Sequence, residues 1–237
     1  IIPVGSIENH GSHLCLGTDY LIPSHIAETL DREVDAVLLP AVPYGIADHH
    51  FGFPGTISLG YDGLRLVMER ITQCLYNYGV RKFIFLNGHG GNDPALLDVG
   101  LGLEDKGALT ALINWWQLAG QLEPAWAGGH GGGEETAAIL AINPDWVHME
   151  DYMPLEPQDL SPELPVSAVR TVRFQGADIT VQRHFQSVTP SGWYGPDDPK
   201  DATAEWGREM LDRVTRYIVD FIRAFSKVDA TQGGRRG

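Results

Sequence analysis

The opening of the chain carries side chains that bind metals, at spacings that let them converge. Glu8 and His10 lie two residues apart just after an apolar run, so an extended chain points both to the same side. Gly11 and Gly17 permit the backbone to turn back and to return Asp19 to the same place. Two carboxylates and an imidazole at the end of a strand form a candidate divalent-metal site. The alternative interpretation is a polar loop in which Asp19 caps a helix.

Two later loops also contain histidines, and each admits a competing interpretation. Residues 43–56 are rich in Gly, Pro and aromatic residues and include His49 and His50, which indicates either a functional loop or a solvated surface turn. Residues 87–92 read Asn-Gly-His-Gly-Gly-Asn and follow an apolar run. Glycine-rich turns often bind phosphate, but this one lacks the spacing of a dinucleotide fingerprint and the Lys-Ser/Thr of a P-loop. We therefore expect its glycines to let His89 and the backbone approach a metal or a small substrate.

The segment 126–136 places a histidine among glycines just before a helix. Glu134 and Glu135 fall in the first turn of that helix, where the helix dipole favours carboxylates, although a helix start needs only one of them. His130 has no structural reason to lie between glycines, so we interpret it as a catalytic histidine beside a ligand carboxylate. Glu135 is the preferred carboxylate, because Glu134 would point about 100° away on a helix.

The elements that must position these loops alternate between strands and helices. The order predicts an α/β fold with a largely parallel sheet, in which the chemistry lies beyond the carboxyl ends of the strands. Apolar runs predict buried strands at 1–4, 36–42, 82–86 and 108–116. Amphipathic or apolar segments predict helices at 19–34, at 62–78, in a stretch ending near 105, at 134–142 and at 202–224. Alternating segments predict a hairpin or edge strands at 169–174 and 178–182.

Composition and charge limit the classes of function. A net charge of −14, from 17 basic and 31 acidic residues, argues against a nucleic-acid partner. There is no run of about 18 apolar residues, so we expect no membrane span. Two cysteines make no disulfide framework, which favours a cytoplasmic location. We expect one domain over residues 1–230 and a disordered tail at 231–237. The chain opens inside a strand without Met, so a leader or a first helix can precede it.

Jointly, these motifs resemble the creatininase (creatinine amidohydrolase) family over nearly the whole chain. The matching pieces are the stretch from Glu8 to Asp19, residues 50–59, residues 87–92, His130 with Glu135, and residues 189–195 followed by 202–207. The resemblance implies a three-layer α/β/α domain and a homo-oligomer, which is a hexamer in creatininase itself. It also implies a metal-dependent hydrolase that cleaves the carbon–nitrogen bond of an amide.

The resemblance further implies a role for each motif residue. The metal ligands of the family fall on Glu8, His10, Asp19 and His89. Asp19 would bridge two divalent ions per chain, and mixed nitrogen and oxygen ligands without cysteine suit Zn, Mn or Fe. His130 falls on the proton-transfer histidine and Glu135 on the acid that follows it. The expected substrate-binding residues are His50, Trp126, Gly90 and Gly91, of which Trp126 matches a tryptophan that lines the creatininase pocket.

One departure from creatininase concerns its metal-binding glutamate two residues after the histidine that corresponds to His89. Here that position is Gly91, and Glu135 would supply the missing carboxylate. Relatives with the same motif include a formamide hydrolase that acts on a pyrimidine nucleotide intermediate and a peptidase that trims the mycofactocin precursor. His49, where relatives often carry an acid, and Cys15, where they often carry proline, border the pocket and would alter specificity.

The expected reaction is hydrolysis of a non-peptide or cyclic amide of a small molecule by a metal-bound hydroxide. Two divalent ions lower the pKa of water from about 15.7 towards 7, and His130 protonates the leaving amine. The alternative activities are those of a peptidase of the mycofactocin-precursor type and a formamide hydrolase. Outside enzymes, the alternative is a non-catalytic metal- or ligand-binding protein. The motif loops contain no Arg or Lys, which argues against a phosphate-bearing substrate unless a neighbouring subunit supplies one.

Overall fold

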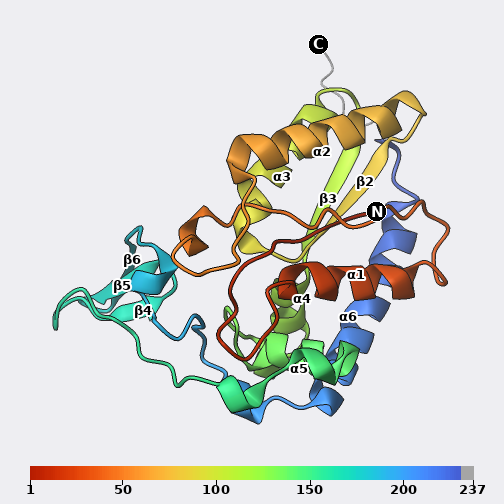
Figure 1. Ribbon diagram of the computed structural model, residues 1–237. Helices are drawn as coiled ribbons and strands as arrows, with labels where there is room; N and C mark the ends of the chain where they lie inside the picture. The colour runs from red at the N-terminus through yellow and green to blue at the C-terminus, as the bar shows by residue number, and fades with distance from the viewer. Residues whose placement is uncertain (231–237) are drawn as a thin grey trace.

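A small parallel sheet runs through the middle of the protein (Figure 1). The computed structural model describes residues 1–230. The strands pair in the order β1-β2-β3, with Ile2 beside Phe85 and Lys82 beside Leu109. The strands are β1 (Ile2–Val4), β2 (Lys82–Asn87) and β3 (Leu109–Asn114). The helices are α1 (Thr18–Leu30), α2 (Gly60–Asn77), α3 (Asp93–Glu104), α4 (Trp115–Leu122), α5 (Gly133–Ile142) and α6 (Ala204–Phe225).

Strand β2 divides the core in two, because successive side chains of a strand point to opposite faces of the sheet. Phe83 and Phe85 belong to a buried cluster that they share with α2 and α3. Ile84 and Leu86 belong to a second cluster, which contains residues of α1, α5 and α6. Figure 1 shows α2 and α3 on one side of the sheet and α1 and α6 on the other. The expected three-layer α/β/α fold with a parallel sheet is confirmed.

The long last helix, α6, packs against α5 and the sheet through an apolar stripe. Met210, Val214 and Ile218 recur every four residues on that stripe and are buried. A Cβ atom at Gly207 would overlap the carbonyl oxygen of Ala137, so glycine lets α6 approach α5 closely. This pair of helices holds the start of α5, where two glutamates of the candidate site lie.

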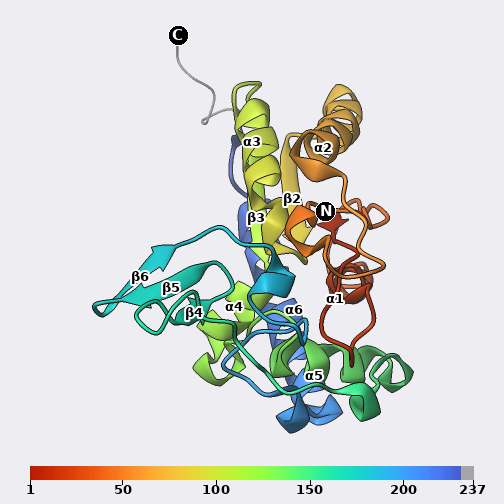
Figure 2. The same ribbon diagram turned by 60° about the vertical axis from the view of Figure 1, so that its left-hand side comes forward.

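A second sheet projects from the body of the protein (Figures 1 and 2). We call it the arm; it consists of β4 (Val166–Ala168), β5 (Thr171–Phe174) and β6 (Ala177–Thr180). Its strands are antiparallel in the order β4-β5-β6. Among its side chains Val172 is buried, and most of the others are at least partly exposed. The hairpin expected at 169–174 and 178–182 is confirmed, and β4 adds a strand to it.

The prediction of a regular strand at 36–42 is wrong. The segment runs beside β1, but only Val42 forms a bridge, with Val4. The amide of Leu39 donates to the carbonyl of Ile1, just before β1, and the amide of Val42 donates to that of Pro3 in β1. Pro40 lies between them and has no N–H to donate, so a continuous ladder cannot form.

Other boundaries differ because the apolar pattern does not mark where one element stops. The run 108–116 contains the end of β3 and the start of α4, a helix that the sequence pattern did not predict. Short 3₁₀ helices lie at Asp48–His50 (η1), Gly90–Asn92 (η2), Pro124–Trp126 (η3), Pro144–Trp146 (η4), Met149–Asp151 (η5), Phe185–Ser187 (η6) and Pro199–Asp201 (η7). Within residues 1–230, no helix has both the length and the apolar character needed to cross a membrane. The tail expected at 231–237 lies outside the described residues.

Candidate active site

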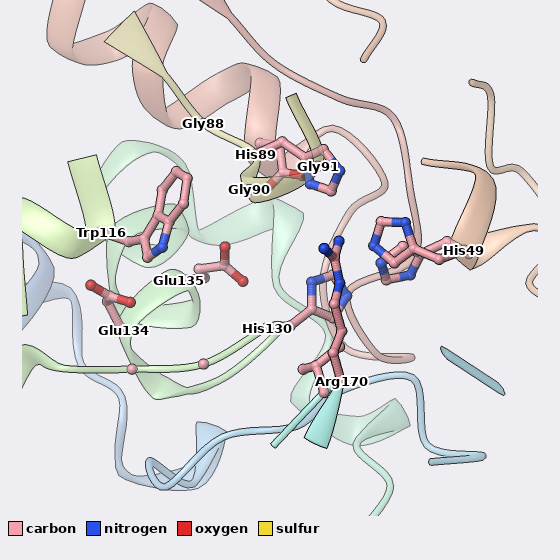
Figure 3. Close-up of a pocket in the computed structure, with 15 residues that line it drawn as sticks. His49, Gly88, His89, Gly90, Gly91, Trp116, His130, Glu134, Glu135 and Arg170 are labelled. Atoms are coloured by element: carbon pink, nitrogen blue, oxygen red, sulfur yellow. Dashed lines mark ion pairs between the residues drawn. The ribbon is translucent and has the colours of Figure 1, made fainter. Parts of the chain in front are cut away.

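The segments that follow β1 and β2 meet the first turns of α1 and α5 beyond the carboxyl ends of the strands. Glu8 and His10 follow β1, and His89 follows β2. Asp19 lies in the first turn of α1 and Glu135 in the first turn of α5. All five side chains are buried, and His89 and Glu135 are drawn in Figure 3. The structure therefore brings together the five residues that the sequence proposed as metal ligands.

Two glycines allow the start of α1 to press against the strand ends. A Cβ atom at Gly88 would overlap the carbonyl oxygen of Asp19. A Cβ atom at Gly5 would lie 2.5 Å from the Cα of Tyr20. Because neither residue has a Cβ, the backbone of α1 comes close enough to place Asp19 among the side chains that follow β1 and β2.

The ligand atoms of these residues lie within a few ångströms of one another. His10 Nε2 is 2.9 Å from Asp19 Oδ1 and 3.7 Å from Glu135 Oε2. His89 Nδ1 is 3.0 Å from Asp19 Oδ2 and 3.1 Å from Glu8 Oε1. Asp19 thus faces both histidines, one with each carboxylate oxygen, as a bridging carboxylate would.

Both histidines are oriented by backbone carbonyls on their far side. His10 Nδ1 donates to the carbonyl of Glu8 at 3.1 Å, and His89 Nε2 donates to the carbonyl of Ile46 at 2.9 Å. A carbonyl oxygen only accepts, so each of these nitrogens carries the proton. The other nitrogen of each ring faces the carboxylates, and once it loses its proton its lone pair would be free to bind an ion between them. This arrangement is typical of metal-binding histidines.

The carboxylates leave buried oxygens without a hydrogen bond. Glu8 Oε1 and Asp19 Oδ2 are buried, and the histidine nitrogens that lie 3.0–3.2 Å from them, on His89 and His50, do not form hydrogen bonds with them. Buried polar atoms are normally paired, and an exception needs a physical reason. Glu8, Asp19 and His89 form one group of ligand atoms within 4.8 Å of one another, and His10, Asp19 and Glu135 form another. The residues present therefore fit divalent cations bound through nitrogen and oxygen.

Charges in this cluster also favour a cation. Burial lowers the pKa of His10, but the carboxylates of Asp19 and Glu135 raise it to about 10. Burial raises the pKa of Asp19, but His10 and His89 hold it well below its ordinary value. Burial raises the pKa of Glu135 to about 8, although His10 opposes the shift. The buried carboxylates attract positive charge, which divalent ions would supply.

His130 lies beside the cluster with one nitrogen fixed and the other facing inward. Its Nε2 donates to the carbonyl of Asn9 at 2.7 Å, and its Nδ1 is 3.8 Å from Glu8 Oε1. Its ring centroid is 4.3 Å from that of His10 and 4.5 Å from that of His50. Burial lowers the pKa of His130 well below its ordinary value, and His10 adds to the shift. The inward nitrogen is placed either to carry a proton or to bind a metal together with Glu8 and His10.

The structure explains why the second carboxylate is absent from the glycine-rich loop. A Cβ atom at Gly91 would overlap both His89 Nε2 and the carbonyl of Ile46, which are hydrogen-bonded to each other. A glutamate at this position would break the bond that orients His89. Glu135 reaches the cluster from α5 instead, and its Oε2 also accepts from the amide of Gly131 at 2.6 Å.

Glu134 lies outside the ligand groups of residues 1–230, in agreement with its expected direction on the helix, but it borders the same cavity. Glu134 is buried and lines the same cavity as Glu135 (Figure 3). A Cβ atom at Gly128 would meet the carboxylates of Glu134 and Asp197, and a Cβ atom at Gly132 would meet that of Asp197, so the two glycines leave room for these side chains. The ligand groups within residues 1–230 include Glu135 but not Glu134.

A cavity of about 190 Å³ opens beside the cluster. Its walls include four of the residues that the sequence proposed to bind substrate or to differ from relatives: His49, His50, Gly90 and Gly91. Trp126 is different, because it packs in the core with α4 and α6 and is not among the residues that line the cavity. Trp116, from the start of α4, lines the cavity instead (Figure 3). A Cβ atom at Gly90 would lie 3.6 Å from its ring.

The cavity also contains a cationic side chain that the sequence pattern did not reveal. Arg170 lines it from the turn between β4 and β5. The argument against a phosphate-bearing substrate rests on motif loops without Arg or Lys, and the position of Arg170 removes that basis. Arg170 lies 35 residues beyond Glu135, the last motif residue that lines the cavity. Nothing in the sequence indicates that the arm returns to the site.

Fold and site together agree with one family. The sequence profile of the creatininase family, described as creatinine amidohydrolase, matches residues 1–222. The chain belongs to the creatininase family and is a hydrolase of a family that acts on amide bonds.

Its relatives differ in the substrates that their names give. The mycofactocin precursor peptide peptidase of Mycolicibacterium smegmatis is 30% identical over 232 residues, which cover 94% of this chain and 83% of the relative. The creatinine amidohydrolase of Pseudomonas putida is 27% identical over 195 residues, which cover 72% of this chain and 75% of the relative.

Solved creatininases share the fold. A crystal structure of creatinine amidohydrolase (creatininase) matches with a TM-score of 0.75 at 25% identity, covering 96% of this chain and 90% of that one. A structure named as the Mn form of creatininase matches with a TM-score of 0.74 at 25% identity, covering 94% of this chain and 89% of its own. A mutant named as the Zn-Zn type matches with a TM-score of 0.73 at 24% identity, covering 94% and 88%.

Proposed function

We propose that this protein is a metal-dependent amidohydrolase that cleaves a carbon–nitrogen bond of a small non-peptide or cyclic amide. The observation that carries the proposal is the orientation of His10 and His89, whose inward nitrogens face the carboxylates of Glu8 and Asp19. Glu8 Oε1 and Asp19 Oδ2 are buried there without a hydrogen bond. Together with Glu135, these residues would hold two divalent ions per chain.

The ions, when bound, polarise the amide carbonyl and lower the pKa of water to a value at which it can react at neutral pH. The chain itself supplies the proton transfer. An amide nitrogen leaves only after it gains a proton, and His130 Nδ1 is the atom that faces the reacting groups. The carbonyl of Asn9 fixes the opposite nitrogen, so the ring cannot turn away while the proton moves.

The donor set and the relatives limit the choice of metal. Three carboxylates and two imidazoles are ligands that suit Zn, Mn or Fe. Solved creatininases are named as Zn-Zn and Mn forms, which supports zinc or manganese. A homo-oligomer, hexameric as in creatininase, and a cytoplasmic location are part of the same proposal; two free cysteines agree with the latter.

The cavity size supports a small substrate. Its volume of about 190 Å³ is below the roughly 300–1,000 Å³ of drug-sized ligand sites. A second candidate is peptidase activity, which is favoured by the 30% identity with the mycofactocin precursor peptide peptidase over 94% of this chain. Formamide hydrolysis is a further candidate activity, because it would need the same metal ligands and its substrate carries a smaller acyl group.

Metal removal tests the proposed function. Protein stripped with a chelator should lose hydrolysis of creatinine, of a simple formamide and of a short peptide, whichever of the three the untreated enzyme cleaves. Addition of Zn²⁺ or Mn²⁺ should restore it, and Mg²⁺ should not, since imidazole ligands suit the transition metals better. Full activity of protein that elemental analysis shows to be free of metal would contradict the proposal.

The two adjacent glutamates provide a test of the second metal site. Glu135→Gln should lower the metal content from about two ions per chain towards one, because it removes the carboxylate near His10 and Asp19. Glu134→Gln is the matched control: it is equally buried, lines the same cavity and belongs to no ligand group within residues 1–230. Elemental analysis of both variants after dialysis decides the matter. Equal metal content in the two would mean that Glu135 is not a ligand.

A further inference from the structure

The arm brings a cation to the mouth of the cavity. Among residues 1–230, Arg170 is the only Arg or Lys that lines it. The residue occupies the turn between β4 and β5, where Ala168 pairs with Thr171. Its carbonyl accepts from the amide of Val181 at 2.9 Å, which fixes the turn against the chain that follows β6. Figure 3 shows the side chain extending from the turn towards the histidines of the cavity.

Arg170 lines the cavity together with His49 and His50 of η1 and with residues 88–91 of the loop after β2. These two segments border the metal-ligand cluster. In agreement with this placement, burial lowers the pKa of His49 to about 3, and the charges of His89 and Arg170 add to the shift.

The other arginines of this region are already paired, and Arg170 is not. Arg173 forms two contacts with Asp178, at 2.6 Å from Nε and 3.1 Å from Nη2. Arg183 donates to the backbone carbonyls of Gln158 and Ser187. Within residues 1–230, the side chain of Arg170 forms no hydrogen bond and no ion pair shorter than 4.0 Å. Its five N–H donors face the cavity mouth without a partner from the fold.

The carboxylates that line the cavity belong to Asp19, Glu134 and Glu135, and within residues 1–230 none of them forms an ion pair with Arg170. Asp93 does not line the cavity and accepts from Asn87 Nδ2 at 3.0 Å and from Asn114 Nδ2 at 2.9 Å. The chain as a whole has a net charge of −14 and would repel an anion from most of its surface. The guanidinium of Arg170 places a positive charge at the mouth of the cavity in this otherwise negatively charged chain. Its planar fork matches the two oxygens of a carboxylate or a phosphate.

We propose that Arg170 binds an oxyanion of the substrate, a carboxylate or a phosphate, while the amide lies at the metal-ligand cluster. The substrate class is then an amide that carries a negatively charged group on the side that faces the arm, with Trp116 as the opposite wall. Arg170 is in this respect a specificity residue. The role depends on the proposed amide hydrolysis for its biological meaning, but binding of the oxyanion can be measured without any reaction.

Three small formamides serve as probes for this role: N-formylglycine, its neutral analogue N-formylglycinamide, and N-formylaminomethylphosphonate. Calorimetric titration of the Zn²⁺-loaded protein should show that the two charged probes bind about 10- to 100-fold more tightly than the neutral one, the range for a hydrogen bond to a charged group. N-Formyl-β-alanine and its amide place one more methylene between the formamide group and the carboxylate or its neutral amide. A carboxylate can also bind the metal ions directly, which would favour the charged probes without Arg170. The quantity to compare is therefore the ratio of affinities for charged and neutral probes in the wild type and in Arg170→Gln.

Arg170→Gln should reduce the preference for the charged probes by about 10- to 100-fold and leave binding of the neutral probe nearly unchanged. Arg173→Gln is the matched control, because it removes a paired arginine of the same arm and should keep the full preference. Arg170→Lys should keep part of the preference, since it retains the charge but not the fork. A larger loss with the carboxylate than with the phosphonate would identify a carboxylate substrate, and the reverse would identify a phosphate.

Formate release, measured in the same samples, separates this role from the proposed function. Binding that depends on Arg170 without release of formate from any probe would count against formamide hydrolysis and leave the oxyanion site intact. Hydrolysis with the same preference in wild type and Arg170→Gln would overturn the role of Arg170 and leave the amidohydrolase standing. An unchanged preference in Arg170→Gln, with or without hydrolysis, overturns the proposal.

Discussion

Asp19→Asn should lower kcat/KM for amide hydrolysis by about 10³-fold or more, because changes even to residues that only orient metal ligands cost 10- to 100-fold. Asp19 faces His10 with one oxygen and His89 with the other, at 2.9 and 3.0 Å. Replacement by the amide keeps the size of the side chain but removes the charge that two ions would share. Metal content should fall for both ions together, and elemental analysis beside steady-state kinetics measures the two effects.

The fold should survive this change. Asp19 lies in the first turn of α1, where loss of a charge costs about 0.3–1 kcal/mol of helix stability at an exposed site and up to about 2 kcal/mol at a partly buried one. Asp31→Asn is the matched control, because Asp31 is an exposed residue at the other end of the same helix. It should retain wild-type metal content and turnover. Two ions per chain and near-normal turnover in Asp19→Asn would show that Asp19 does not bridge them.

His130→Ala should lower kcat by about 10²- to 10⁴-fold, the usual contribution of a positioned acid–base group. The reason is that His130 Nδ1 is the inward atom of a ring whose other nitrogen is held by Asn9. Substrates with a good leaving group should lose less rate, since they need less help from a proton donor. A series of amides with amines of decreasing basicity measures this difference.

Metal content distinguishes the two roles that the geometry allows for this histidine. We expect it to change little in His130→Ala, although Nδ1 is 3.8 Å from Glu8 Oε1 and forms a ligand group with Glu8 and His10. His148→Ala, at an exposed histidine, is the control and should be normal in both properties. Loss of metal in proportion to activity would make His130 a ligand and would remove it as the proton donor.

The positions of the candidate ligands could be predicted because they depend on local order along the chain. Glu8 and His89 each follow an apolar strand, and parallel strands end at the same edge of a sheet. The glycines at 5 and 88 are visible in the sequence, but their function is not. Only the structure shows that they let α1 approach the strands and place Asp19.

The features that could not be predicted depend on contacts between distant segments. Arg170 reaches the cavity because the arm folds back over it, and hairpin periodicity contains no information about where a hairpin docks. Trp116 and Trp126 lie at the two ends of the same short α4–η3 region, and packing alone decides that Trp116 lines the cavity. Pro40, in contrast, is visible in the sequence, and its missing N–H already argues against a regular strand at 36–42.

Anomalous diffraction from crystals of the Zn²⁺-loaded protein tests the central claim most directly, because it locates the ions independently of activity. We expect two zinc peaks in the cluster, one among Glu8, Asp19 and His89 and the other among His10, Asp19 and Glu135. Asp19 should lie between the two peaks. No peak within this cluster, in crystals of protein that hydrolyses amides, would contradict the account.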